Sequence, residues 1–248
     1  MSRIMLYLRK SLVPVLGFMA TAILFTACLK NDDDDFHKIP ASGLMAANLA
    51  PDQESMVITL SGNVLTQQPL GYSNFTGGYR NVYTGTREVA AYDYPSNQPL
   101  ATVNHEFKDS TYYSLFVVGF DGHYRNVIAT DDFDNLSASS GKAYVRYVNA
   151  IVDTVNTALV SVAQGGSTVI NDNAAFGQVG EFTAVDPGDI NIAVKQGGNV
   201  DVNRTITVEE KKVYTILLQG VPGETSEPRK VQIKYITNGT LTDEDGDK

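Results

Sequence analysis

Groups for acid–base or metal chemistry are poorly spaced in this 248-residue chain, which has three histidines and 28 carboxylates. A zinc site of the H-E-x-x-H type needs a second histidine, and the segment HEFKD, His105–Asp109, has only the first. The sequence also lacks a G-x-S-x-G nucleophile elbow and a phosphate loop ending in G-K-[ST]. We therefore predict no enzyme activity, no catalytic residues, no metal and no cofactor, and expect His105 on a strand.

Two acidic segments superficially resemble calcium loops, where alternate oxygens converge on the cation. DDFDN, Asp131–Asn135, has no glycine at the turn and no suitably placed glutamate, and DEDGD, Asp243–Asp247, ends with the chain. We interpret them as a solvated linker and a solvated tail. A glycosidase-type carboxylate pair stays open, because such a pair is set by space rather than by sequence spacing.

The only cysteine, Cys28, follows a pattern typical of secretion. MSRIMLYLRK carries three basic residues, SLVPVLGFMATAILF is fifteen residues without charge, and the small Thr26 and Ala27 come next. This is the order of a signal peptide. The apolar run is shorter than the roughly 20 residues of a spanning helix, although an uncleaved anchor helix remains the alternative.

The segment LFTAC resembles the bacterial lipobox, with Phe25 in the usual leucine position and Leu24 one place further away. The resemblance implies that Cys28 receives diacylglycerol through a thioether and becomes the first residue of the mature protein. Each buried methylene contributes about 0.8 kcal/mol, so several acyl chains hold a protein on a membrane. We expect residues 1–27 to be removed and Cys28 to be the attachment to the membrane.

Four aspartates follow the cysteine almost directly. LKNDDDD, which contains Asp32, Asp33, Asp34 and Asp35, resembles the acidic export tag of Bacteroidota lipoproteins. That resemblance implies a lipid-anchored protein of the outer membrane that faces the cell exterior. The alternatives are an inward-facing periplasmic anchor and a solvated spacer, since blocks of like charge repel and do not fold.

The charge of the chain excludes one class of partner. Residues 1–27 carry three of the 19 basic residues and no acidic residue, so a chain that begins at Cys28 has 16 basic and 28 acidic residues, a net charge of −12. An acidic body repels phosphate backbones, and we predict no nucleic-acid partner.

An internal repeat organises the rest of the chain. At a constant offset of 101 residues, identical residues align in similar apolar contexts, for example YYSLFVVG with VYTILLQG. The aligned pairs are Asn48 with Asn149, Asp52 with Asp153, Phe75 with Phe176, Tyr113 with Tyr214, and Gly119 with Gly220. The sequence therefore predicts a duplicated domain.

Each copy shows the pattern of β-strands. Segments such as MVITLSGN and DINIAVKQGG alternate or run apolar for five to seven residues and end at Gly or Asn. In TITV, Ile206 and Val208 should face one side and the two threonines the other. The segment VEEKKVY reads as a hairpin with a charged turn. Short strands broken by Gly, Pro, Asn and Asp predict an all-β sandwich in each copy.

The expected organisation follows from these patterns. The segments are a signal peptide at 1–27, an acidic tether at 28–40, a first β-sandwich at 41–130, a linker at 131–142, a second β-sandwich at 143–237 and an acidic tail at 238–248.

The second copy resembles the domain-of-unknown-function family 4397. The features that carry the resemblance are the opening VRYVNA with a following Asp, the central AFG, the strand PGDINIAV and the closing KVYTILLQG. The resemblance covers residues 143–220 well and the first copy more loosely, where Tyr83 to Thr86 replace the Pro-Gly of the family. It implies two tandem immunoglobulin- or transthyretin-like β-sandwiches on a secreted or lipid-anchored protein, and it supplies no catalytic residues.

Tyrosines are concentrated in the first copy, and tyrosine is enriched at binding interfaces. The alternative is half-buried strand positions. The absence of Trp counts against a dedicated polysaccharide module. We expect a non-enzymatic envelope protein that acts in adhesion, assembly or binding; the alternative is a glycan-capturing accessory lipoprotein, so the partner is an unknown protein or glycan. The candidate binding residues are Tyr72, Tyr79, Tyr83, Tyr92 and Tyr94.

Overall fold

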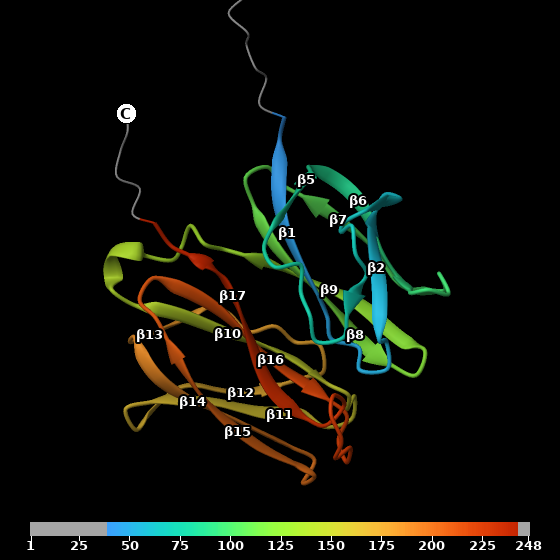
Figure 1. Ribbon diagram of the computed structural model, residues 1–248. Coiled ribbons are helices and arrows are strands. Elements are labelled where there is room, and N and C mark those ends of the chain that lie inside the picture. Colours follow the sequence, from blue (N-terminus) through green and yellow to red (C-terminus); the bar gives the residue numbers. More distant parts are fainter. Residues whose placement is uncertain (1–38, 243–248) are drawn as a thin grey trace, which may run out of the picture. The chain divides into compact units, whose positions relative to one another are not determined.

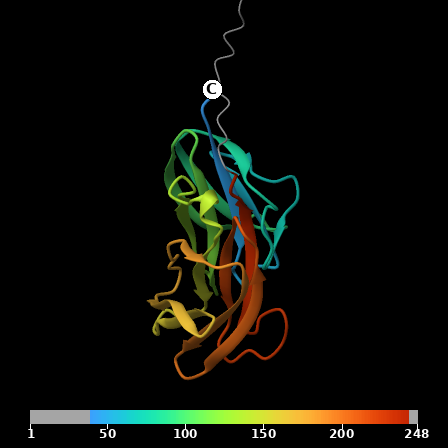
Figure 2. The same ribbon diagram turned by 90° about the vertical axis from the view of Figure 1, so that its left-hand side faces the viewer.

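The computed structural model describes residues 39–242, and residues 40 onward belong to one compact unit. The described chain is all-β and forms two tandem β-sandwiches, as the sequence predicts, with one 3-10 turn, η2, at Ala138–Ser140. The strands of the first sandwich are coloured blue to green in Figure 1 and those of the second yellow to red. Figure 2 shows the same two groups from the side.

The first sandwich contains nine strands. Its inner sheet has the order β5-β1-β8-β9, and its outer sheet has the order β3-β2-β6-β7, with β4 paired to β2. The bounds are β1 Ala41–Asn48, β2 Ser55–Leu60, β3 Asn63–Val64, β4 Leu70–Gly71, β5 Arg80–Tyr83, β6 Gly85–Asp93, β7 Pro99–Phe107, β8 Tyr112–Phe120 and β9 His123–Asp131.

The second sandwich repeats this arrangement. Its inner sheet has the order β13-β10-β16-β17, and its outer sheet has the order β12-β11-β14-β15. The bounds are β10 Ala143–Ile151, β11 Ala158–Gln164, β12 Ser167–Ala174, β13 Thr183–Val185, β14 Gly188–Gln196, β15 Val200–Val208, β16 Lys212–Gly220 and β17 Gln232–Thr240.

Strand pairing confirms the duplication at the predicted offset. The parallel pair β1 and β8 sets Leu44 opposite Tyr113, and the pair β10 and β16 sets Val145 opposite Tyr214, so both partners shift by 101 residues. A buried asparagine in each copy, Asn48 or Asn149, uses its side-chain oxygen to accept a hydrogen bond from the backbone NH two residues later. Equivalent residues therefore make equivalent bonds.

The strands of the inner sheets are buried on both faces. In β1, Leu44 and Ala46 face the core of the first sandwich, whereas Met45 and Ala47 face a different apolar cluster. Continuous apolar runs are typical of strands covered on both sides, whereas a strand with one wet face alternates. The segment TITV in β15 does alternate: Ile206 and Val208 are buried and the threonines exposed.

The apolar cluster that contains Met45 and Ala47 is separate from the cores of the two sandwiches and joins the two inner sheets. We call it the inter-sandwich cluster. Each sheet contributes side chains that are almost fully buried, including Phe116 from the first and Leu217 from the second. Phe75 and Phe176, paired at the offset of 101, are partly buried against it. The buried residues of the inter-sandwich cluster are Met45, Ala47, Leu49, Phe116, Val118, Val148, Ala150, Leu217 and Ile236.

The prediction of a hairpin at VEEKKVY is wrong. β15 pairs with β14 in the outer sheet, whereas β16 pairs with β10 and β17 in the inner sheet. The charged turn at residues 209–211 therefore crosses between the sheets of one sandwich. The sequence pattern of two strands joined by a short polar turn is the same in both cases, and only long-range pairing separates them.

The segment that begins at Asp131 is not solvated along its whole length. Asp131 is the last residue of β9 and is 2% exposed, because it forms an ion pair with Arg146 of the second sandwich. The expected boundary at residue 130 falls within β9, and the expected boundary at residue 237 falls within β17.

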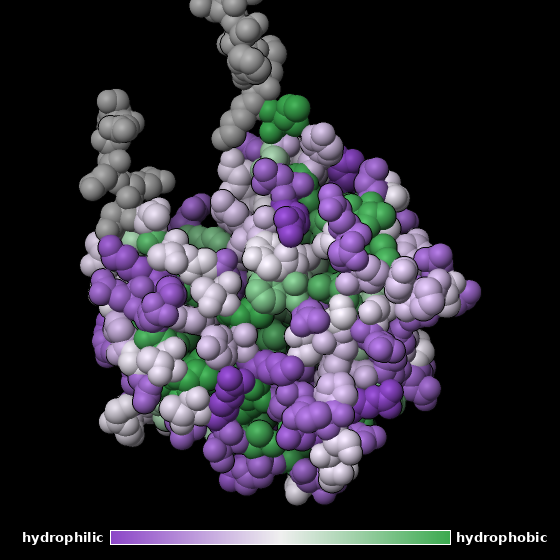
Figure 3. Space-filling model, in the orientation of Figure 1, coloured by the Kyte–Doolittle hydropathy of each residue, from purple (hydrophilic) through white to green (hydrophobic). Residues whose placement is uncertain are grey.

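The face of the molecule in Figure 3 is mainly hydrophilic, with apolar side chains visible in separate patches. None of the helices within residues 39–242 has the length and apolar character that crossing a bilayer requires.

Candidate ligand-binding site

A hollow of about 560 Å³ lies on the first sandwich, where β7, the start of β8 and the segment after β9 meet. Its walls combine aromatic side chains, among them Tyr112 and Phe133, with acidic and amide groups. This volume lies in the range of small-ligand sites, and aromatic walls with a few polar groups are typical of them. Polar and charged residues of the lining include Asn104, Glu106, Lys108, Asp132 and Asp134.

An aromatic cluster forms one side of this hollow. The ring centroids of Tyr79 and Tyr112 are 5.0 Å apart, those of Tyr112 and Phe133 are 5.4 Å apart, and those of Tyr79 and Phe133 are 5.8 Å apart. The two contacts of Tyr79 are edge-to-face and that of Tyr112 with Phe133 is tilted, and such ring contacts fix ring positions. Tyr112 nevertheless remains 44% exposed, so part of its side chain is accessible to a ligand.

The chain makes room for the Tyr112 ring with a glycine. A Cβ atom built on Gly43, the residue opposite Tyr112 in the parallel pair of β1 and β8, would lie 2.5 Å from Cδ1 of Tyr112. The equivalent positions of the second sandwich are Tyr144 and Val213. The aromatic cluster is therefore a property of the first copy and not of the shared fold.

His105 also lines the hollow and lies within the aromatic contacts of β7 and β8. Its ring packs edge-on against Phe107 and Tyr113 at centroid distances of 4.9 and 5.0 Å. Burial lowers the pKa of His105, while the Glu106 carboxylate opposes that shift. The residue at the equivalent position of the second copy is Ile206, which is buried on a strand, whereas His105 is half-buried. His105 is on a strand, as predicted, and burial disfavours the charged form of its ring.

A buried ion pair lies beneath the hollow and joins the two sandwiches. The Arg146 guanidinium is 2.5 Å from Oδ1 of Asp131, and their side chains are 2% and 0% exposed. Ser114 donates a hydrogen bond to Oδ2 of Asp131 at 2.6 Å and accepts one from Arg146 at 3.0 Å. The pair is therefore neutralised within the protein and adds no net charge to the hollow.

Hydrogen bonds extend this ion pair across both inner sheets. Tyr79 donates its hydroxyl to Asp131 and accepts from Asn238 at 3.1 Å. Thr215 accepts from Arg146 at 3.0 Å and donates to Asn238 at 2.7 Å. Burial, followed by the charge of Asp131, raises the pKa of Tyr79 far above its ordinary value. The network couples a ring of the aromatic cluster to the second sandwich.

The structure does not gather the five predicted tyrosines. Tyr79 alone belongs to the aromatic cluster. Tyr72 is half-buried near Glu227 and Arg229, and burial raises its pKa to about 12.

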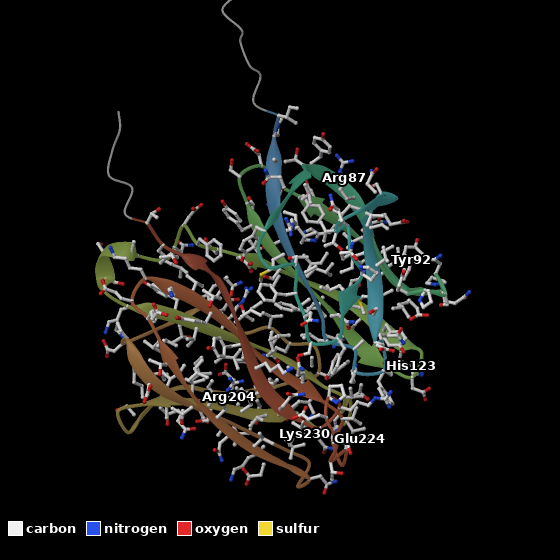
Figure 4. The ribbon with its side chains drawn as sticks, in the orientation of Figure 1. Arg87, Tyr92, His123, Arg204, Glu224 and Lys230 are labelled. Carbon is white, nitrogen blue, oxygen red and sulfur yellow. The ribbon has the colours of Figure 1, made fainter. Side chains whose placement is uncertain are left out.

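The other three tyrosines lie elsewhere on the first sandwich. Tyr83 is 65% exposed with the Arg87 guanidinium over its ring at 5.9 Å, and Tyr94 is 49% exposed. Tyr92 is half-buried in the outer sheet, on the side away from the second sandwich (Figure 4). No ring contact joins these three within the described residues. The five predicted tyrosines therefore lie in five separate environments.

Sequence reasoning missed Tyr112 and Phe133 as site residues. One signal for Phe133 is present, an aromatic residue within the acidic run DDFDN. The signal for Tyr112 is the comparison of the two copies: at the offset of 101 residues, Tyr112 of the first copy aligns with Val213 of the second, so the ring is specific to the first copy. Cys28 and Asp32 to Asp35 lie outside the described residues. Within residues 39–242, no group of three or more His, Cys, Asp or Glu side chains is arranged to hold a metal ion.

Comparisons with known proteins give a family but no close relative. The model of the domain of unknown function DUF4397 matches twice, over residues 42–159 and 143–238, and no curated protein matches the chain. One similar solved structure is the family CBM26 module CBMbc from Eubacterium rectale Amy13K in complex with maltoheptaose. Identity is 11% and the TM-score 0.22, with 78% of this chain and 96% of that chain covered. Another is the tip fimbrial protein Mfa3 from Porphyromonas gingivalis, at 10% identity and a TM-score of 0.26, with 80% and 99% covered.

Proposed function

We propose, from the premise that this chain belongs to the DUF4397 family of domains of unknown function, that it is a non-enzymatic binding protein of the cell envelope. In this proposal the lipid on Cys28 anchors the chain to the outer membrane, the two sandwiches act as one body, and the hollow on the first sandwich takes the ligand. The function in the cell is adhesion or assembly at the surface.

The single observation that carries the proposal is the hollow with the partly exposed Tyr112 ring. Two copies of one fold differ at this place, since the second copy has Val213 where the first has Tyr112. The fold itself does not require a tyrosine at this position, because the second sandwich has the apolar Val213 at the equivalent position. The stability of the first sandwich therefore does not explain Tyr112. A partly exposed aromatic ring beside polar groups is the ordinary composition of a binding surface.

Binding to cells tests this function. We would measure the binding of the labelled full-length chain to intact cells that lack it, and to surfaces coated with maltoheptaose or mucin. Wild type should bind at least one of these targets, and Tyr112→Leu should lose most of that binding. The matched control is Tyr235→Leu, which removes a ring of 39% exposure on the second sandwich and should bind like wild type. Equal binding by Tyr112→Leu and wild type would reject the hollow as the site.

A second candidate function is glycan capture. Tyr112 and the amide of Asn104 line the same hollow, and an aromatic face with hydrogen-bonding groups suits a sugar ring. Binding to maltoheptaose or mucin that is lost in Tyr112→Leu, with no binding to bare cells, would favour this function over cell adhesion.

Replacing Cys28 by Ala should release the chain from membranes or leave a precursor that retains residues 1–27. The reason is that the thiol is the only group in the chain that can form the thioether to lipid. The measurement is membrane fractionation combined with the intact mass of the wild-type chain. An unmodified Cys28 in the wild-type mass would overturn the lipid anchor.

Replacing Asp32, Asp33, Asp34 and Asp35 by Ala should leave the chain lipidated and membrane-bound but hidden from protease added to intact cells. The four positions precede the first strand, which begins at Ala41, so we expect the folded body to be unchanged. Protease accessibility that persists in the alanine variant would show that the aspartates are only a spacer, while the lipid anchor would stand.

A further inference from the structure

The hollow on the first sandwich carries an excess of negative charge. Glu106, Asp132 and Asp134 are exposed in its walls, and Lys108 is the basic side chain that lines it. Within the described residues, no ion pair joins any of these three carboxylates to a base. Asp131, which also lines the hollow, is already paired with Arg146.

The remaining groups do not offset this charge. Burial lowers the pKa of His105, which disfavours its charged form, and Asn104 is uncharged. A concave site lined by one sign of charge concentrates the field and attracts the opposite sign. The net charge of −12 that the mature chain would carry reinforces the same preference. An anionic ligand is therefore disfavoured in the hollow.

The aromatic cluster adds an attraction of the same sign. The face of a Tyr or Phe ring is negative, and a cation within about 6 Å of the ring centroid is attracted to it. Tyr112 and Phe133 both line the hollow, and their ring centroids lie 5.4 Å apart with the planes inclined by 49°. The protein itself makes this contact nearby, where the Arg146 guanidinium lies 4.3 Å from the ring centroid of Phe182.

We propose that the hollow binds an organic cation, an ammonium or guanidinium group, held between the rings of Tyr112 and Phe133 and the carboxylates of Glu106, Asp132 and Asp134. The cation is a lysine or arginine side chain of a polypeptide or a free amine. The inference rests on the proposed function, since it names the ligand chemistry of the same hollow.

Calorimetric titration of the full-length lipidated chain in detergent tests this ligand class. The cationic probes are Nα-acetyl-lysine methylamide, which stands for a side chain, and methylammonium, which stands for a free amine. Nα-acetyl-norleucine methylamide has the same backbone without the charge, and maltoheptaose is a neutral sugar. The variants are Tyr112→Leu, which keeps an apolar side chain but removes the ring, and Asp134→Asn, which removes one charge. Tyr235→Leu is the matched control.

At least one cationic probe should bind, and the norleucine probe should not. Affinity for that probe should fall about 2- to 30-fold in Tyr112→Leu, should also fall in Asp134→Asn and with added salt, and should be unchanged in Tyr235→Leu. The stronger of the two cationic probes identifies the source of the cation. No binding of either cation, or binding of maltoheptaose in their place, would overturn the inference. If neither cation bound but Tyr112→Leu still abolished binding to cells, the inference of a cationic ligand would be wrong. The proposed function of the hollow as a binding site would then still stand.

Discussion

Replacing Arg146 by Ala should lower the free energy of unfolding by about 3–5 kcal/mol, because it leaves the Asp131 carboxylate buried without its partner. The Asp131 side chain is fully buried, and the remaining donors near it are the hydroxyls of Ser114 and Tyr79. Two neutral hydrogen bonds do not replace a guanidinium 2.5 Å away. Denaturation by urea, followed by circular dichroism, measures the loss.

The double variant Asp131→Asn with Arg146→Met is the control. It removes both charges and keeps the volume of the side chains, and replacing a buried pair by neutral groups is often close to neutral for stability. We expect the double variant to recover most of the stability that Arg146→Ala loses. A double variant as unstable as the single one would show that Arg146 acts through its hydrogen bonds to Thr215 and Ser114 rather than by compensating the charge of Asp131.

Replacing Phe116 by Ala should cost about 3–5 kcal/mol, because the side chain is fully buried between the two inner sheets. Phe116 faces the inter-sandwich cluster and not the core of its own sandwich, so the cavity would open between the sandwiches. The loss should appear as one cooperative transition of the whole body if the sandwiches unfold together. The measurement is thermal unfolding by calorimetry.

Tyr112→Leu, on the same strand, is the control for that prediction. Its ring is 44% exposed, and leucine keeps apolar contact with the neighbouring rings. We expect a loss of about 1 kcal/mol or less, in line with an exposed position. A loss from Phe116→Ala no greater than that from Tyr112→Leu would contradict a tightly packed interface between the sandwiches.

The fold could be predicted from the sequence because its signals are local or repeated. Alternation in TITV and the uninterrupted apolar run of YYSLFVVG predict strands, and the spacing of 101 residues between Tyr113 and Tyr214 predicts the duplication. The uninterrupted apolar run of YYSLFVVG also reflects a feature that only the structure shows. Its strand is buried on both faces because a second sandwich covers the inner sheet.

The site and the connection between sheets could not be predicted because they depend on long-range placement. The ion pair of Asp131 with Arg146 joins the two sandwiches. Asp131 belongs to the acidic run DDFDN, which is typical of a solvated linker, so the sequence did not indicate a buried carboxylate. The turn at residues 209–211 looks like a hairpin turn until the partners of β15 and β16 are known. The hollow needs β7, β8 and the segment after β9 together, and no sequence spacing shows that meeting.

The most direct test of the hollow as the ligand site is hydrogen–deuterium exchange of the chain while it is bound to its cellular target. Binding should slow exchange in segments 104–113 and 130–134, which contain the residues that line the hollow, and leave the outer sheet of the second sandwich unchanged. Protection confined to the second sandwich, for example at the smaller hollow lined by Tyr147 and Asp172, with no change in residues 104–113, would contradict the account.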